Sequence, residues 1–353
     1  MKKTLLATAI AGALAASGAQ AATVYNQDGT KLDIYGNIQI AYASVDEGAE
    51  TTDQIADNGT TFGFAAEHVI NQGLTGYLKL EFDDIQADEI KSNDEDTTGD
   101  QAYVGVKGNF GDVRLGSYDQ LIDDWIQDPL TNNEYFDVSD STSEAGYGGI
   151  RETDKVTYTS PSLSGFQFAV GTQYKGDAES ENIDDSGSAS AFGGVKYTAG
   201  AFSVAAVYDN LENFQYIDGN NVESVGDQYG VTFQYTIETL RLAAKYERFD
   251  TDNASVTGVP DYDFYALGAR YGYGMGDIYG AYQYVDEGGE GVSNINSNNT
   301  PNNDQNDDDN RNEVIVGATY NVSDAMYTWV EAAWRDKELD EGDGVGVGVT
   351  YLF

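Results

Sequence analysis

Residues 345–353, with the sequence VGVGVTYLF, alternate between two kinds of side chain. The aliphatic and aromatic residues share one face at period two: Val345, Val347, Val349, Tyr351 and Phe353. The other face carries Gly346, Gly348 and Thr350. This period predicts a β-strand with one apolar face. In a soluble domain such a terminal strand would leave an edge that aggregates, whereas the last strand of a closed barrel pairs with the first. The stretch therefore favours a closed β-barrel.

The first 21 residues have the three parts of a secretory signal peptide. Lys2 and Lys3 precede an apolar run of about 13 residues, and Ala19-Gln20-Ala21 forms a small-x-small cleavage pattern. The run is too short to span a bilayer as a helix. We therefore expect residues 1–21 to be removed after export and residues 22–353 to form one domain.

The composition of the chain suits many strands joined by tight turns. It contains 26 Tyr and 41 Gly but only 4 Pro and no Cys. The formal net charge of −42 excludes nucleic acid as a partner, because the phosphate backbone would be repelled. The same charge fits two interpretations: a solvated acidic surface in salty surroundings, or a role in selecting ions.

Alternating segments separated by turn signals predict sixteen strands. Their ranges are 31–43, 59–70, 74–86, 100–108, 111–118, 150–160, 164–175, 188–198, 201–211, 225–236, 239–250, 262–272, 276–287, 312–322, 325–337 and 343–353. The connections alternate between tight turns and long acidic stretches at 44–58, 87–99, 119–149, 176–187, 212–224, 251–261 and 288–311. This alternation is typical of a transmembrane, antiparallel, up-and-down β-barrel of the outer membrane. The fold class is therefore all-β, with apolar strand faces toward lipid and polar faces lining water.

Several stretches resemble the general diffusion porins of Gram-negative outer membranes. They are residues 32–36 (LDIYG), 103–107 (YVGVK), 110–116 (FGDVRLG), 158–161 (YTSP) with 164–166 (SGF), and the final Phe353. The resemblance implies a homotrimer of sixteen-stranded barrels in the outer membrane of a Gram-negative bacterium. It also implies contact with outer-membrane lipid and lipopolysaccharide, and a terminal signal at Tyr351 and Phe353 that the outer-membrane assembly machinery reads.

The connection 119–149 differs from the other long loops because it is rich in apolar residues, including Trp125, Ile126 and Phe136. So much apolar surface must pack on something. In the family that it resembles, the third external loop folds into the barrel and narrows the pore. A lid on the barrel rim, or packing on a neighbouring subunit, is the alternative.

The predicted constriction sets acids of this loop against bases of the opposite wall. The loop acids are Asp119, Asp123, Asp124 and Asp128, and the bases at inward positions are Lys79, Arg114, Arg151 and Lys155. Asn37, Thr61, Gln101 and Ser117 stand where the family often has basic residues. Because carboxylates then dominate, we expect a cation-selective passive pore for small hydrophilic solutes and ions.

A sugar-selective porin and a secreted calcium-binding adhesin are the alternatives to a general passive pore. A sugar-selective porin would need a run of aromatic residues along one inner wall, and Tyr35, Tyr77 and Tyr103 are candidates that look scattered. A secreted calcium-binding adhesin would show a short fixed repeat, and none appears. Residues 302–310 resemble a calcium loop in composition but lack its central glycine, which leaves weak divalent-cation binding by acidic loops as the alternative to a merely solvated loop. The only histidine, His68, has no cysteine or second histidine with which to form a transition-metal site. It falls on the outward face of its predicted strand and not on the water side, so no Ser-His-Asp triad can form there. No cofactor and no enzyme activity are therefore expected.

Overall fold

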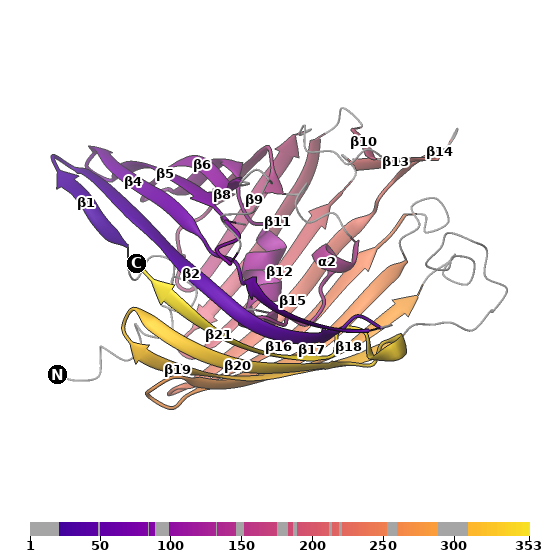
Figure 1. Ribbon diagram of the computed structural model, residues 1–353. Coiled ribbons are helices and arrows are strands. Elements are labelled where there is room, and N and C mark those ends of the chain that lie inside the picture. The colour runs from indigo at the N-terminus through magenta and orange to yellow at the C-terminus, as the bar shows by residue number, and fades with distance from the viewer. Residues whose placement is uncertain are drawn as a thin grey trace.

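The computed structural model describes residues 21–48, 50–83, 85–88, 99–131, 133–145, 152–174, 183–185, 189–211, 214–218, 221–252, 260–288 and 310–353. Within them, antiparallel strands close into a single barrel (Figure 1). Its wall consists of β2 (Thr30–Asp46), β3 (Thr51–Asp57) with β4 (Phe62–Asn71), β5 (Leu74–Phe82), β6 (Gly99–Gly108), β7 (Gly111–Ser117), β8 (Lys155–Thr159), β9 (Phe166–Tyr174), β11 (Ala189–Ala199), β12 (Phe202–Asn210), β15 (Asp227–Ile237), β16 (Leu240–Asp250), β17 (Asp261–Gly272), β18 (Asp277–Gly288), β19 (Arg311–Ser323), β20 (Met326–Arg335) and β21 (Gly344–Leu352). Counting β3 with β4 as one, these are the sixteen expected wall strands.

The barrel closes between its first and last wall strands, as the terminal sequence predicts. β21 pairs antiparallel with β2, from Asn37 opposite Leu352 to Val45 opposite Gly344. Beyond this pairing, the backbone N–H of Gly36 donates to the Phe353 carbonyl at 3.0 Å, and the N–H of Phe353 donates back to Gly36 at the same distance. The last residue therefore belongs to the seam.

A short strand that the sequence analysis did not predict, β1 (Ala22–Gln27), extends this seam. It pairs with the first half of β2, from Ala22 opposite Ile34 to Gln27 opposite Thr30. Asp28 and Gly29 connect the two strands with positive φ angles of 52° and 75°. An Asp-Gly pair is a strong hairpin signal, so the sequence did hold a cue for β1. The first and last strands of the chain thus share one edge of β2.

The second wall strand is longer than predicted. β3 and β4 both pair with β2, on the edge opposite β21, and a break at residues 58–61 separates them. The expectation of a loop over 44–58 is therefore wrong for residues 51–57. Their sequence, TTDQIAD, contains one large apolar residue and so carries little alternation. Three further short strands, β10 (Ile183–Asp185), β13 (Phe214–Asp218) and β14 (Asn221–Ser224), form a separate sheet between two long connections.

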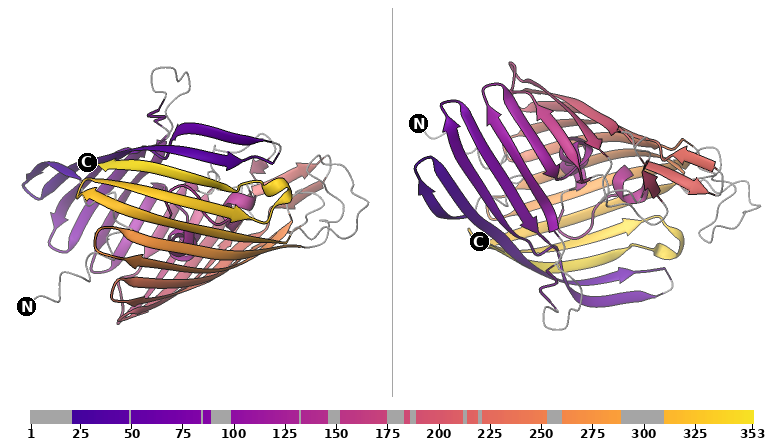
Figure 2. Two further views of the ribbon diagram at one scale, coloured as in Figure 1. Left: turned by 60° about the horizontal axis from the view of Figure 1, so that its bottom comes forward. Right: turned by 90° about the horizontal axis from the view of Figure 1, so that it is seen from above.

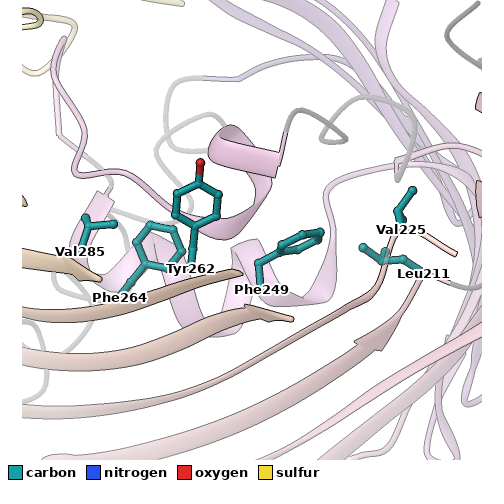
Figure 3. Close-up of a cluster of buried hydrophobic side chains, with 6 residues drawn as sticks. All are labelled: Leu211, Val225, Phe249, Tyr262, Phe264 and Val285. Carbon is teal, nitrogen blue, oxygen red and sulfur yellow. The ribbon is translucent and has the colours of Figure 1, made fainter. Parts of the chain in front are cut away.

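The outer face of the wall is apolar and exposed, whereas small and polar side chains face inward. Along β21 the exposed residues are Val345, Val347, Val349 and Tyr351, and Thr350 between them is buried. Figure 2 shows the wall from two further directions, with the C-terminus at the end of the barrel where the short turns lie. A second apolar group, shown in Figure 3, lies on strands β16–β18 and the ends of nearby connections: Leu211, Val225, Phe249, Tyr262, Phe264 and Val285. None of the helices in the described ranges is long and apolar enough to cross a membrane.

The described residues from Asp119 to Ala145, here called the inner segment, pack against the inward face of the wall. They form a π-helical turn η1 (Asp123–Gln127), α1 (Asp128–Thr131) and α2 (Ser141–Ala145). Ile122, Trp125 and Ile126 pack on small or slender inward residues of β9 and β12: Ala169, Ala205 and Val207. Leu130 packs on Ala243 and Ala266. The apolar residues of the predicted loop therefore cover the alanine-rich side of the interior.

Candidate functional site

Three wall glutamates bind the backbone of the inner segment. The carboxylate of Glu331 on β20 accepts hydrogen bonds from the backbone N–H groups of Glu134 (3.1 Å), Tyr135 (3.0 Å) and Phe136, and from the hydroxyl of Tyr279. Backbone N–H groups in an irregular segment have no helical or sheet partner, and burying them unpaired would cost free energy. Glu331 supplies that partner.

Glu313 and Glu247 do the same further along the segment. Glu313 accepts from the backbone N–H (2.8 Å) and Oγ (2.7 Å) of Ser139, and Glu247 accepts from the N–H of Ser141 (2.9 Å) and from Gln127 Nε2 (2.6 Å). Lys245 pairs with Glu247 at 2.9 Å and Arg311 with Glu313 at 2.9 Å. All three glutamates are at most 1% exposed. The sequence analysis missed them, although an acid at an inward position in the middle of a strand is a usable signal.

Two of the four predicted loop acids, Asp119 and Asp124, line the same cavity. Asp119 accepts two hydrogen bonds from Gln101 Nε2 on β6, at 2.8 and 2.9 Å. The charges of Asp119, Asp124 and Asp128 act on one another. Asp123 instead caps its own segment, accepting from the Gln120 N–H (3.2 Å) and the Thr142 hydroxyl (3.2 Å). Asp119, Asp124 and Asp128 therefore form an interacting group, whereas the carboxylate of Asp123 is hydrogen-bonded within the segment, although the charge of Asp124 also acts on it.

The predicted bases are in different environments. Lys79 donates to Glu81 (2.9 Å) and to Gln101 Oε1 (3.1 Å). Lys155 is 2% exposed and donates to the backbone carbonyls of Tyr118 and Asp119, so it anchors the start of the inner segment. The guanidinium of Arg114 faces a cavity. Arg151 lies outside the described residues.

The list of inward bases taken from the sequence was incomplete. The wall also carries Lys196, Arg241, Lys245, Arg270, Arg311 and Arg335 on its inward face or in contact with the inner segment. Several are paired with acids, as Arg270 is with Glu134 (3.5 Å) and Arg311 with Glu144. These bases lie on β11, β16, β17, β19 and β20, beyond the first six wall strands, which contain Lys79, Arg114 and Lys155.

Inward tyrosines form a continuous row. The ring centroids of Tyr77 and Tyr103 are 6.2 Å apart, and those of Tyr103 and Tyr118 are 5.6 Å apart, both edge to face. The view that these tyrosines are scattered is therefore wrong for Tyr77 and Tyr103. Cations stack on the row: Arg114 lies 5.0 Å from the Tyr103 centroid and 4.2 Å from that of Tyr118. Tyr35 is separate and 4% exposed, with Lys79 at 5.9 Å from its ring centroid.

A cavity of about 360 Å³ lies between β7–β9, β11 and the inner segment. Its polar lining includes Asp112, Arg114, Asp119, Asp124, Thr157, Thr159 and Gln167, and its apolar lining includes Leu121, Trp125 and Phe192. Burial raises the pKa of Asp124 to about 6, and the carboxylate of Asp119 adds to the rise. Burial and the charge of Asp124 raise the pKa of Asp128 to about 7. These two carboxyls therefore change charge near neutral pH.

Comparisons with known proteins agree with this architecture. The model of the Gram-negative porin family matches residues 7–351. A Halomonas protein named "Monosaccharide porin" is 62% identical over 370 residues, covering 100% of both chains. Among solved structures, Salmonella typhi OmpF in complex with daunomycin matches with a TM-score of 0.71 at 21% identity, over 94% of this chain and 100% of that one. The anion-selective porin of Comamonas acidovorans matches with a TM-score of 0.67 at 17% identity, over 92% of this chain and 100% of that one.

An apolar outer face, a barrel closed at its first and last strands, and a whole-chain family match agree with one another. A chain this acidic with large apolar residues exposed along its strands has the surface expected of an outer-membrane barrel. The chain belongs to the Gram-negative porins, passive pores of the outer membrane that are not enzymes.

Proposed function

We propose that this porin passes small hydrophilic solutes and prefers cations, with the inner segment narrowing the passage. The observation that carries the proposal is that Asp119 and Asp124 line one cavity beside that segment and that the charge of Asp128 interacts with both. The bases whose charges act on Asp124 and Asp128 are Arg114, Lys155, Lys196 and Arg241, and Lys155 is buried against backbone carbonyls. Carboxylates that form no direct ion pair in a narrow aqueous passage concentrate cations and repel anions. The fold alone does not determine whether the pore prefers cations or anions, because the anion-selective porin of Comamonas acidovorans has the same fold.

The same proposal includes three further properties. They are assembly as a homotrimer, contact with outer-membrane lipid and lipopolysaccharide, and recognition of Tyr351 and Phe353 by the assembly machinery. They are supported by the resemblance to the trimeric porins. The exposed apolar band supplies the surface that lipid or a neighbouring subunit would cover. The predicted signal peptide, residues 1–21, lies almost entirely outside the described residues and remains a prediction. Residues 302–309 also lie outside them, so weak divalent-cation binding by that acidic loop remains a prediction too. An adhesin is not supported, because the relatives are porins.

Passage of neutral monosaccharides is a second candidate function. Its support is the name of the 62%-identical Halomonas relative, together with the row formed by Tyr77, Tyr103 and Tyr118 beside a cavity with many hydrogen-bonding groups. Cation preference and sugar passage are compatible in one pore, because a neutral sugar is not repelled by carboxylates.

Cation preference should increase with pH. Asp124 and Asp128 have raised pKa values of about 6 and about 7, so they are mostly neutral at pH 5 and mostly charged at pH 8. One unit charge at about 4 Å in water is worth about 1 kcal/mol, which corresponds to a factor of about five in permeability. Because two carboxyls gain charge, we expect the potassium-to-chloride permeability ratio to rise by at least about fivefold from pH 5 to pH 8.

The measurement is the zero-current potential of the purified porin in a planar bilayer under a KCl gradient. At pH 8 the zero-current potential should have the sign that indicates cation preference. Its magnitude should decrease at high salt, because salt screens the electric field of the carboxylates. Equal permeability for potassium and chloride at low salt and pH 8 would contradict the proposal.

A further inference from the structure

We propose that the cavity between β7 and the inner segment is a binding subsite for one neutral hexose, with Arg114 and Asp124 as its opposed hydrogen-bonding groups. The inference rests on the second candidate function, passage of monosaccharides, and adds the residues that would recognise the sugar. Three features of the cavity support this proposal. They are an arginine and an aspartate whose side chains make no hydrogen bond within the described residues, and a lining of polar and apolar groups around a volume that suits a small ligand.

Arg114 is held in place without using its hydrogen-bond donors. Its guanidinium is stacked by the rings of Tyr103 and Tyr118, at 5.0 and 4.2 Å from their centroids. Within the described part of the chain its side chain makes no hydrogen bond and no ion pair. A guanidinium has five N–H donors in a fixed plane. Stacking therefore orients donors toward the cavity at little further cost in side-chain entropy on binding.

Asp124 provides acceptors to the same cavity from the inner segment, whereas Arg114 lines it from β7. Unlike Asp119 and Asp123, its carboxylate accepts no hydrogen bond from the residues that can be described. It is close enough to Arg114 for their charges to act on each other, yet within the described residues the two form no direct ion pair. An arginine and an aspartate that line one cavity without pairing leave a space between them that a ligand can bridge.

The lining and the volume suit a small polyol. About 360 Å³ falls in the range of pockets that hold small ligands. Thr159 and Gln167 add neutral hydrogen-bonding groups, and Trp125 and Phe192 add apolar surface for the C–H face of a sugar ring. Three carboxylates, those of Asp112, Asp119 and Asp124, oppose the one guanidinium in this lining. The excess of negative charge disfavours anionic solutes and leaves a neutral sugar as the better match.

The test is the block of single-channel potassium current by glucose in a planar bilayer. In the wild type the current should fall and saturate with increasing glucose. Arg114→Gln and Asp124→Asn should each raise the half-saturating glucose concentration by about tenfold, which is the loss expected for a hydrogen bond to a charged group. Lys107→Gln is the matched control: Lys107 is also stacked over a tyrosine, 5.2 Å from the Tyr77 centroid, but it lies outside the cavity lining and should leave the block unchanged. Heat-modifiable gel mobility checks that each variant is folded.

Glucose-driven swelling of proteoliposomes separates failure of the subsite from failure of sugar passage. Swelling without a saturable block, or a block that Arg114→Gln and Asp124→Asn leave unchanged, would overturn the subsite while sugar passage stands. Absence of swelling would overturn both. A block of the current by the zwitterion glycine betaine but not by glucose would also overturn the inference. Arg114 and Asp124 would then bind the negative and positive groups of a zwitterion and not a neutral sugar.

Discussion

Glu331→Ala is expected to release the inner segment and make the open current unstable. The substitution removes the acceptor for three consecutive backbone N–H groups, those of Glu134, Tyr135 and Phe136. Buried N–H groups that lose a charged acceptor cost about 1–3 kcal/mol each, so a total loss of at least about 3 kcal/mol is expected. Single-channel recordings should show current fluctuating among levels, and thermal unfolding should occur at lower temperature than in the wild type.

Two variants make that experiment specific. Glu67→Ala removes a glutamate that pairs with Lys107 and is half exposed, so the current should stay steady. Glu331→Gln keeps one acceptor oxygen in place and should have an intermediate effect. If Glu331→Ala gives the same steady current and the same thermal unfolding as the wild type, the wall glutamate does not hold the segment.

Deleting Phe353 is expected to reduce assembly in cells far more than folding in detergent. Within the seam, Phe353 contributes two backbone hydrogen bonds with Gly36 and a ring contact with Phe62, whose centroid lies 6.4 Å away. The rest of β21 keeps its nine residue pairs with β2, from Asn37–Leu352 to Val45–Gly344. The refolded barrel should therefore lose little, whereas a terminal signal read by the assembly machinery would be lost entirely.

The measurement compares folded, heat-modifiable protein in outer membranes with the refolding yield in detergent micelles. Val349→Ala, on the same outward face of β21, serves as the control and should leave both amounts close to those of the wild type. If the Phe353 deletion reduces the amount of folded protein equally in outer membranes and in detergent, Phe353 contributes only to the pairing of β21 with β2 and is not an assembly signal.

The wall could be predicted from the sequence because its period-two pattern is repeated sixteen times. Even the closing strand follows from alternation alone, because Val345, Val347, Val349, Tyr351 and Phe353 share one face. β1 and β3 were missed for different reasons. The Asp28-Gly29 hairpin signal was overlooked, whereas residues 51–57 have almost no alternating apolar residues, so only their pairing with β2 makes them a strand.

The candidate site was predicted less completely because an irregular segment has no period that assigns its faces. The sequence placed the acids in the right connection but could not show that Asp123 bonds within its own segment while Asp124 faces a cavity. It likewise could not show that Lys155 is buried under backbone carbonyls. Glu247, Glu313 and Glu331 could have been found, since strand parity places each of them on the inward face.

The most direct test of whether the loop acids set ion preference compares the wild type with Asp124→Asn/Asp128→Asn. The zero-current potential of both is measured at pH 8 in the same low-salt KCl gradient. We expect a cation-directed potential for the wild type and a clearly smaller one for the variant, whose potential should change less between pH 5 and pH 8 because the remaining pH dependence comes only from other acids such as Glu134 and Asp137. Equal potentials for the two proteins, or an anion-directed potential for the wild type, would contradict the role assigned to these carboxylates.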